Sequence, residues 1–248
     1  MKGDDEIGDR FQELTKYAPT RLGGGARPAR RPAGFKEYAS AEALPIGLAE
    51  LPAGSLWKAL QDRRSRRSFT DQAISREALS QLVWAVQGPT GKAGDLVLRT
   101  APSAGALYPL ETYLVVNRVD GLKEGLYHYN VRKTALELIK KGAQGPALTA
   151  AAFEQGMCAR AAVVFALTAI ADRCKWKYAQ RAWRYVYMEA GHLGQSLYLA
   201  AADLGLGCCA VGAFYDENIN DILGVDGESE TILYLLPVGP VKEKPEEE

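Results

Sequence analysis

Four arginines and a serine lie together in the segment DRRSRRSF, at positions 63–67. Guanidinium groups this close repel one another unless an anion lies between them. A planar guanidinium matches the oxygens of a phosphate, and a serine hydroxyl adds a neutral donor. The segment therefore predicts a phosphate site. A solvent-exposed basic patch is the alternative, and a nucleic-acid surface has less support because the net charge of the chain is zero.

A second candidate for chemistry is the pair Lys177 and Tyr178, which comes just before a long apolar stretch. We predict that the pair lies at the start of the central helix. The positive end of the helix dipole would there favour a neutral amine and a deprotonated phenol. Each side chain could then take or give a proton. The alternative is an exposed lysine beside a packed tyrosine.

Two segments of small residues are candidates for ligand contact. In residues 101–109 (APSAGALYP), Ser103 offers a hydroxyl, and the residues after it expose backbone amides to a flat ring or a phosphate. Residues 205–210 (GLGCCA) formally match the dinucleotide pattern GxGxxA. That pattern requires a strand before it and a helix after it. Here we predict a helix before and a strand after, so we reject a dinucleotide site.

The central helix is expected over residues 183–204, which contain no proline and carry apolar residues on nearly every face. Such a helix is buried in a large core or spans a membrane. Polar and charged residues interrupt it too often for a membrane span. Gly191 and Gly194 share a face, where a second backbone or a flat ligand could approach closely. Gln195 shares a face with His192 and is a candidate ligand residue.

The remaining elements mix without a regular alternation of strand and helix. Helices are expected at 55–60, at 75–86 with Ser75 as the N-cap, at 145–153 and from Asp216. Strands are expected at 111–117, 125–130, 134–139, 161–170, 208–214 and 231–239, a turn-rich loop at 88–94, and an irregular arm at 21–34. This order favours an α+β architecture over a doubly wound sheet.

Composition narrows the function classes. The 248 residues are 47% hydrophobic, and 30 basic residues balance 30 acidic ones, so no overall field attracts nucleic acid or an anionic membrane. The four cysteines show no CxxC spacing and no HExxH occurs, so we expect no metal site. The N-terminus is polar and lacks the apolar core of a signal peptide, which favours a cytoplasmic location.

Taken together, RRSRRSF, PSAGALYPLE, YHY, the Lys-Tyr pair, EAGHLGQSLYLAA and LLPVG resemble the FMN-dependent nitroreductase family. They resemble most closely its SagB-type (thiazole/oxazole-forming) dehydrogenase branch. The resemblance implies an α+β fold with a central antiparallel sheet flanked by helices and a long central dimerisation helix. It also implies a homodimer with FMN at the subunit interface. The expected organisation is an N-terminal arm (1–54), an FMN-binding domain (55–244) and a charged tail (245–248).

The resemblance also implies roles for individual residues. In the branch, a Lys-Tyr pair removes a proton from an azoline ring while hydride passes to flavin N5, and Lys177 and Tyr178 match that pair. Loop residues from the second subunit would line the flavin ring, and the segment after the central helix would pass the N5 edge. The implied cofactor-binding residues are Arg63, Arg64, Ser65, Arg67, Pro102, Ser103, Ala104, Gly105, Leu107, Gln195, Ala210, Val211, Gly212 and Ala213, with Lys242 and Lys244 matching loosely.

Enzymes of this branch act on a peptide azoline and normally work with a cyclodehydratase. Two alternatives stay open. The chain could be a stand-alone reductase that uses NAD(P)H to reduce nitroaromatics or quinones, or a non-catalytic flavin-binding module. The three are distinguished by which donor, if any, bleaches a bound flavin.

Overall fold

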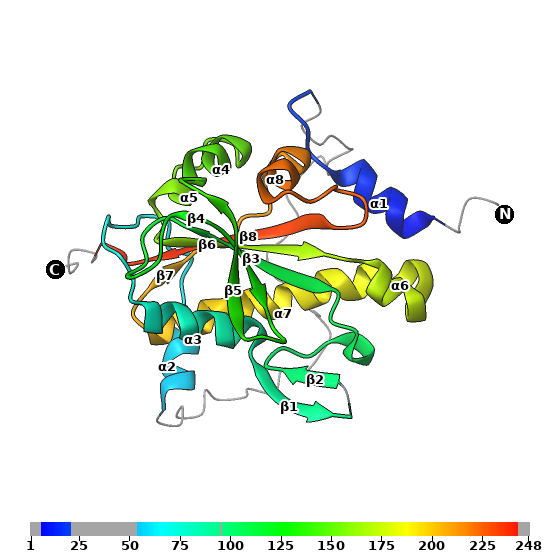
Figure 1. Ribbon diagram of the computed structural model, residues 1–248, viewed down its shortest axis with the longest axis horizontal. Coiled ribbons are helices and arrows are strands. Elements are labelled where there is room, and N and C mark those ends of the chain that lie inside the picture. The colour runs from blue at the N-terminus through cyan, green and yellow to red at the C-terminus, as the bar shows by residue number, and fades with distance from the viewer. Residues whose placement is uncertain (1–5, 21–53, 95, 243–248) are drawn as a thin grey trace, which may run out of the picture.

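A six-stranded antiparallel sheet forms the centre of the molecule (Figure 1). The computed structural model describes residues 6–20, 54–94 and 96–242. The strand order is β5-β4-β3-β6-β8-β7, and each neighbouring pair is antiparallel. The strands are β3 (Leu110–Val116), β4 (Gly125–Asn130), β5 (Ala135–Lys141), β6 (Val163–Ala169), β7 (Gly207–Cys208) and β8 (Thr231–Gly239). The predicted antiparallel sheet is confirmed.

Helices cover both faces of this sheet and create two apolar cores. On one face pack α3 (Arg76–Gln87) and the long helix α7 (Ala182–Asp203). On the other face pack α4 (Gly145–Ala151), α5 (Met157–Arg160) and α8 (Asp216–Leu223). Every residue of β6 is buried, because helices cover this strand on both sides. The α+β layer architecture expected from the sequence is therefore confirmed.

The predicted start of α3 is also confirmed. The Ser75 side chain accepts a hydrogen bond from the backbone N–H of Ala78 at 3.0 Å, so it caps one of the unpaired donors of the first turn. Apolar residues recur at helical spacing along α3, and Leu79, Leu82 and Val86 are buried against the sheet.

The long helix α7 is buried on one side only, which corrects the expectation of a helix enclosed all round. Its covered side includes Val186, Leu193 and Leu197, whereas the opposite side is exposed and carries Met188 at 55% exposure. The two glycines do not share a contact either. A Cβ built on Gly194 would lie 3.2 Å from the ring of Tyr234 in β8, whereas one built on Gly191 would meet nothing within 4 Å.

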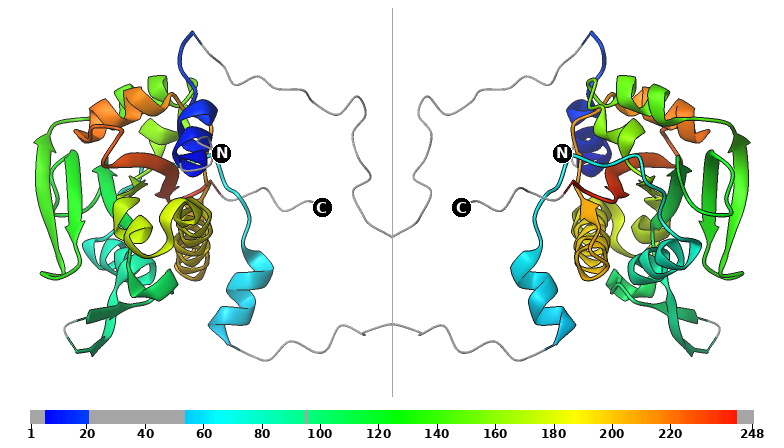
Figure 2. Two further views of the ribbon diagram at one scale, coloured as in Figure 1. Left: turned by 90° about the vertical axis from the view of Figure 1, so that its right-hand side faces the viewer. Right: turned by 90° about the vertical axis from the view of Figure 1, so that its left-hand side faces the viewer.

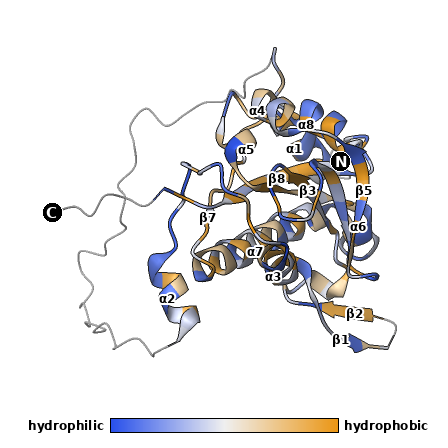
Figure 3. Cartoon of the chain, turned by 60° about the vertical axis from the view of Figure 1, so that its left-hand side comes forward, coloured by the Kyte–Doolittle hydropathy of each residue, from blue (hydrophilic) through white to orange (hydrophobic). Residues whose placement is uncertain are grey.

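Two peripheral elements extend from this body. Residues 88–94, expected to be a loop, instead begin a hairpin of β1 (Pro89–Ala93) and β2 (Leu96–Arg99), because the turn chemistry hid a short strand pair. Figure 2 shows α2 (Ser55–Asp62) on the side of α7 away from the sheet. The helix carries both hydrophobic and hydrophilic residues (Figure 3), and its Leu56 and Leu60 side chains are exposed.

Helix α1 (Ile7–Thr15) packs on α7, although it precedes residue 55. The Asp9 carboxylate accepts a hydrogen bond from the Trp183 indole at 2.7 Å and forms an ion pair with Lys175 at 2.6 Å. The predicted arm at 21–34 lies outside the described residues. Among the helices in the described part of the chain, none is long and apolar enough to cross a membrane.

The polar end of the sheet gives a pH-dependent contribution to stability. His128 Nε2 lies 2.9 Å from Glu111, and Nδ1 lies 3.3 Å from Glu137. The hydrogen bond with Glu111, helped by Glu137, raises the pKa of His128 above its ordinary value of 6.5. The folded protein therefore binds this proton more tightly than the unfolded chain.

This stabilisation is fully present below pH 6.5 and is lost as the pH rises through the raised pKa of His128. We expect the melting temperature to fall as the pH rises from 6.5 through the raised pKa of His128, and His128→Gln to flatten that fall. Thermal unfolding followed by circular dichroism across this range is the measurement. An unchanged slope in His128→Gln would contradict the assignment.

Candidate functional site

The arginine segment meets two distant parts of the chain at the C-terminal end of α7. After α2 ends, Ser65 pairs with Cys208 of β7, and the Arg66 backbone N–H donates to the Cys208 carbonyl at 2.9 Å. A few residues later, Phe69 pairs with Val241, which follows β8. Residues 63–69, 207–211 and 240–242 therefore form one cluster. Lys242 follows Val241 directly and is exposed beside it, whereas Lys244 lies outside the described residues.

Tyr198 on α7 connects this cluster, although nothing in the sequence marked it. Its hydroxyl lies 3.0 Å from Ser65 Oγ and accepts a hydrogen bond from the Ala210 backbone N–H at 2.7 Å. The Arg63 guanidinium lies 5.4 Å from the centroid of the Tyr198 ring, within cation–π range. The sequence shows it only as a tyrosine within the otherwise aliphatic stretch LYLAAA.

The charges of this cluster are not neutralised within the described chain. Arg64, Arg66 and Arg67 are exposed, and none of the four arginines forms an ion pair among the described residues. A small cavity of about 170 Å³ lies here, lined by Arg64 and Arg66 together with Tyr198, Cys208 and Val241. Asp62, which is paired with Lys58, also lines it, whereas Arg63, Ser65 and Arg67 do not. Arg66 was not among the predicted ligand residues. The donor set fits a phosphate, since guanidinium and hydroxyl groups are the donors that phosphate oxygens prefer.

The segment after α7 is less regular than predicted. A strand was expected through residue 214, but β7 contains two residues and is followed by one isolated bridge between Val211 and Leu235. Gly212 and Ala213, which follow this bridge, are exposed and belong to no strand. The helix α7 precedes GLGCCA, and the strand β7 follows its first glycine. This order is the reverse of the one that a dinucleotide site requires, so the rejection of such a site is unchanged.

Lys177 and Tyr178 do not lie at the start of the long helix. They end a separate short helix, α6 (Asp172–Tyr178), and the turn η2 (Ala179–Arg181) separates them from α7. The argument from the positive helix dipole is therefore wrong, because the C-terminal end of a helix carries the opposite partial charge. Lys177 is exposed, and its Nζ lies 5.5 Å from the centroid of the Tyr178 ring.

Both side chains converge on Gly105 of the small-residue loop. A Cβ built on Gly105 would lie 2.8 Å from the Tyr178 hydroxyl and 3.1 Å from Lys177 Nζ. Gly105 also has a φ of +62°, a conformation that favours glycine. A larger residue would displace the two polar atoms. The structure thus brings the predicted Lys-Tyr pair and the predicted loop together.

The backbone around this convergence is strained. Ala106 has a φ of 54° and Tyr108 a φ of 46° on the loop side, and Ala179 has a φ of 46° just after Tyr178. Non-glycine residues adopt this left-handed conformation at a cost of about 1 kcal/mol or more each, and such residues cluster at functional sites. Three of the six such residues in the described chain flank this one place.

Glu189, in the middle of α7, holds the loop. It accepts a hydrogen bond from the Ala104 backbone N–H at 2.8 Å and another from the Ser103 side chain. Ser103 Oγ in turn accepts from the Tyr108 backbone N–H at 2.8 Å. Glu189 is 4% exposed, and this burial raises the pKa of its carboxyl group. The sequence showed Glu189 only as a charged interruption of an apolar helix.

Glu189 should therefore act as a positioning residue. In Glu189→Ala the Ala104 N–H loses its acceptor, at a cost of about 1–3 kcal/mol, which lowers the melting temperature by roughly 2–10 °C. Glu189→Gln keeps an acceptor and removes the cost of burying a charge, so its melting temperature should stay at or above that of the wild type. Thermal unfolding of both variants tests this, and equal losses in both would contradict the role of the acceptor.

Within one chain, the small-residue loop and the arginine cluster lie apart along α7. Glu189, which holds the loop, and Tyr198, which joins the arginine cluster, are nine positions apart on α7. At 1.5 Å per residue the separation along the helix is about 13 Å. Gln195 lies between them in sequence, on the exposed side of the helix with Met188.

Comparison with known protein families shows which family this chain belongs to. The sequence pattern of the nitroreductase family matches residues 60–240, which include the arginine cluster, the loop and the Lys-Tyr pair. The chain belongs to the nitroreductase family. This makes it a member of an oxidoreductase family, as the motifs implied. A Methanocaldococcus jannaschii protein provisionally named a nitroreductase is 38% identical over 198 residues, covering 80% of this chain and 97% of that protein.

Two further similarities are to a trifolitoxin-processing protein and to a chain of a microcin synthetase. The trifolitoxin-processing protein TfxB of Rhizobium leguminosarum bv. trifolii is 26% identical over 138 residues, 54% of this chain and 37% of that protein. A chain of the E. coli microcin synthetase McbBCD complex with truncated pro-MccB17 bound superposes with a TM-score of 0.68 at 20% identity. That superposition covers 96% of this chain and 92% of that chain, and it shows a shared fold.

A provisionally named nitroreductase of Anabaena variabilis superposes on this nitroreductase-family chain with a TM-score of 0.66 at 30% identity. The superposition covers 75% of this chain and 38% of the Anabaena chain.

Proposed function

We propose that the protein is an FMN-dependent oxidoreductase that dehydrogenates an azoline ring in a peptide. The convergence of Lys177 Nζ and Tyr178 Oη on Gly105 carries this proposal. It places an amine and a phenol, two groups able to move protons, beside a loop whose glycine leaves room for close approach. The similarity to TfxB, which is named a trifolitoxin-processing protein, supports a peptide as the substrate.

The residues of the arginine cluster fit the phosphate of FMN. Arg63, Arg64, Ser65 and Arg67 would hold it, with Arg66 and Lys242 adding positive charge, and Tyr198 would fix Ser65 and the Ala210 amide in place. The family, one of whose solved members is named an FMN-dependent nitroreductase, supports this assignment. When bound, FMN would supply the acceptor for one hydride, which carries the two electrons of the oxidation.

Lys177 and Tyr178 would manage the proton. Conversion of an azoline to an azole breaks two C–H bonds, one of which loses a hydride and the other a proton, and leaves one new double bond. We assign the proton to the Lys177–Tyr178 pair. Glu189 would hold Ser103 and Ala104 so that Gly105 stays below both polar atoms.

A homodimer would complete the site. Within one chain the arginine cluster and the loop are separated by about 13 Å along α7. The family resemblance implies that the loop of a second copy lines the flavin ring held by the first. The exposed side of α7, with Met188 at 55% exposure, and the exposed Leu56 and Leu60 of α2 offer an apolar surface for that copy. Size-exclusion chromatography with light scattering tests this part.

A second candidate is a stand-alone reductase that oxidises NAD(P)H and reduces nitroaromatics or quinones. The similarity that favours it is the 38% identity to a protein named as a nitroreductase. The two functions share the flavin and differ in the hydride donor.

An absorption spectrum of the freshly purified protein tests both candidates. Flavin bands that bleach anaerobically with a thiazoline peptide, and not with NADPH, support azoline dehydrogenation. Bleaching by NADPH alone supports the reductase. A colourless protein that also fails to take up FMN would contradict both functions and the assignment of the arginine cluster.

A further inference from the structure

A second, larger cavity is lined in part by the small-residue loop. It has a volume of about 400 Å³ and is enclosed by β2, the ends of β3 and β4, the start of α6 and the loop itself. Its lining residues include Ala106 and Leu107, which directly follow Gly105. The cavity therefore borders the residues that directly follow the glycine on which Lys177 and Tyr178 converge.

Positive charge predominates in this cavity. Its described lining contains Arg99, Arg132 and Arg173 as well as His128, against a single acid, Glu111. Glu111 is already engaged, since it forms an ion pair with Arg173 and a hydrogen bond with His128. Arg99 and Arg132 form no ion pair among the described residues.

Arg99 is held rigidly without being neutralised. Its guanidinium donates to the neutral Gln87 side chain and lies 4.3 Å from the centroid of the Tyr108 ring. The Tyr108 hydroxyl accepts from the Arg99 backbone N–H at 3.2 Å. Nε of Arg99 is buried and has no hydrogen-bond partner. Burial of this charge lowers the pKa of Arg99, and the nearby Glu111 carboxylate only partly opposes this effect.

The cavity and the Lys-Tyr pair are also linked by α6. Arg173 lines the cavity and Lys177 lies four residues later, so the two share one face of the helix. One turn separates them by roughly 6 Å along the helix axis. An anionic group bound near Arg173 and the reacting atoms at Lys177 and Tyr178 would therefore be parts of one substrate molecule.

We propose that this cavity is an anion subsite that binds a carboxylate or phosphate group of the substrate through Arg99, Arg132 and Arg173. The identity of the substrate rests on the proposed oxidoreductase function. The binding of an anion rests on the residues of the cavity alone. A carboxylate would belong to a peptide substrate, and a phosphate to a nicotinamide nucleotide.

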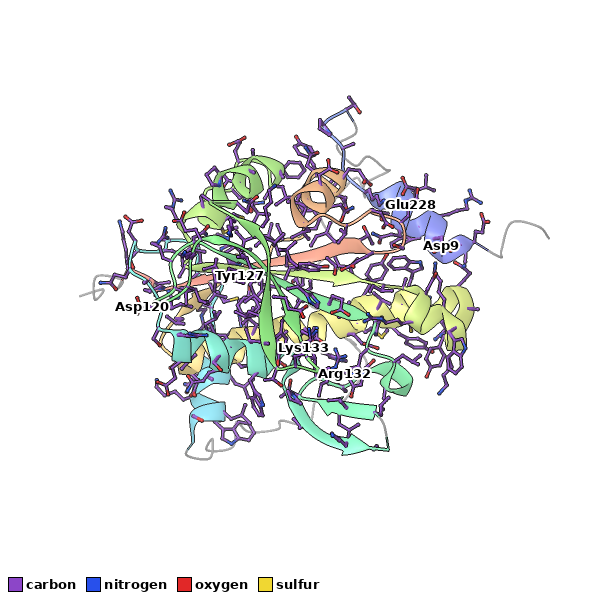
Figure 4. All side chains as sticks on the ribbon, viewed as in Figure 1. Asp9, Asp120, Tyr127, Arg132, Lys133 and Glu228 are labelled. Carbon is purple, nitrogen blue, oxygen red and sulfur yellow. The ribbon has the colours of Figure 1, made fainter. Side chains whose placement is uncertain are left out.

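Two neighbouring cations allow a matched test. Arg132 and Lys133 both lie at the turn between β4 and β5, on the side of the β1–β2 hairpin (Figure 4). Both are exposed, but Arg132 lines the cavity, whereas Lys133 forms an ion pair with Glu137 at 2.8 Å and does not line it. Arg132→Gln and Lys133→Gln each remove one positive charge from the same turn, so they change the overall charge equally.

The experiment is isothermal titration calorimetry of the FMN-saturated protein at low salt, with pyrophosphate as one probe and N-acetylglutamate as the other. We expect at least one probe to bind the wild type, Arg132→Gln to weaken that binding by about tenfold, and Lys133→Gln to change it less than about twofold. Binding of pyrophosphate alone assigns a phosphate, and binding of N-acetylglutamate alone assigns a carboxylate.

The subsite is contradicted if neither probe binds at millimolar concentration, or if the two variants weaken binding equally. Failure of the proposed function gives a different result. If no azoline is turned over by the FMN-saturated protein, but anion binding still depends on Arg132 and not on Lys133, the subsite stands and the reaction assigned to it is wrong.

Discussion

Tyr178→Phe and Lys177→Ala should each lower azoline dehydrogenation by about 10²–10⁴-fold while leaving FMN bound. Each change removes one of the two polar atoms that converge on Gly105, and proton transfer by a positioned side chain contributes an effect of this size. The arginine cluster lies at the other end of α7 and is left intact. The measurements are kcat with a thiazoline peptide and the flavin content of each purified variant.

Tyr185→Phe is the matched control for the loss of a phenol. The Tyr185 ring packs edge-on against the Tyr178 ring at 4.8 Å, but its hydroxyl accepts a hydrogen bond from Arg181 and does not meet Gly105. Its turnover should stay within about threefold of the wild type. Wild-type turnover in both Lys177→Ala and Tyr178→Phe would remove the pair from the mechanism.

Arg64→Ala should weaken FMN binding by about tenfold to a hundredfold. Arg64 lines the small cavity in the arginine cluster and forms no ion pair among the described residues, so its charge is available to a phosphate. A hydrogen bond to a charged group contributes about 1.5–3 kcal/mol, and 1.4 kcal/mol corresponds to a factor of ten. Fluorescence titration of the apoprotein with FMN gives the dissociation constant.

Two controls separate phosphate recognition from loss of the fold. Lys141→Ala removes an exposed cation from β5, at the opposite edge of the sheet from β7 and the arginine cluster, and should leave FMN affinity unchanged. Riboflavin lacks the phosphate, so it should bind the wild type weakly and show no further loss in Arg64→Ala. Equal affinities of the wild type for FMN and riboflavin would show that the cluster does not hold a phosphate.

Local patterns in the sequence were sufficient for most of the framework. The apolar run at 231–239 is β8 to the residue, and the serine before the helical repeat at 75 caps α3. Both depend on interactions within a few residues or on uniform burial, which leave a clear signature in one segment. The hairpin at 89–99 was missed because its glycines and proline indicate turns more strongly than strands.

The residues of the site also divide into those that the sequence predicted and those that it did not. The chemical types of Arg63, Lys177 and Tyr178 were visible in the sequence because charge and proton-transfer capacity belong to the side chains themselves. Their partners were not visible. Tyr198 and Glu189 come from the middle of a helix and look like ordinary core positions until the fold places Ser65, Ala210 and Ala104 against them.

The sequence by itself determined the kinds of group available: a cluster of arginines, a Lys-Tyr pair and a glycine with room beside it. Only the tertiary structure decided which groups meet. It ended α6 at Tyr178 and so placed Lys177 and Tyr178 over Gly105, more than seventy residues earlier in the chain. It also enclosed Arg99, Arg132 and Arg173 around one cavity. The physical reason is that such contacts between distant segments are set by how the sheet and helices pack, which no short stretch of sequence encodes.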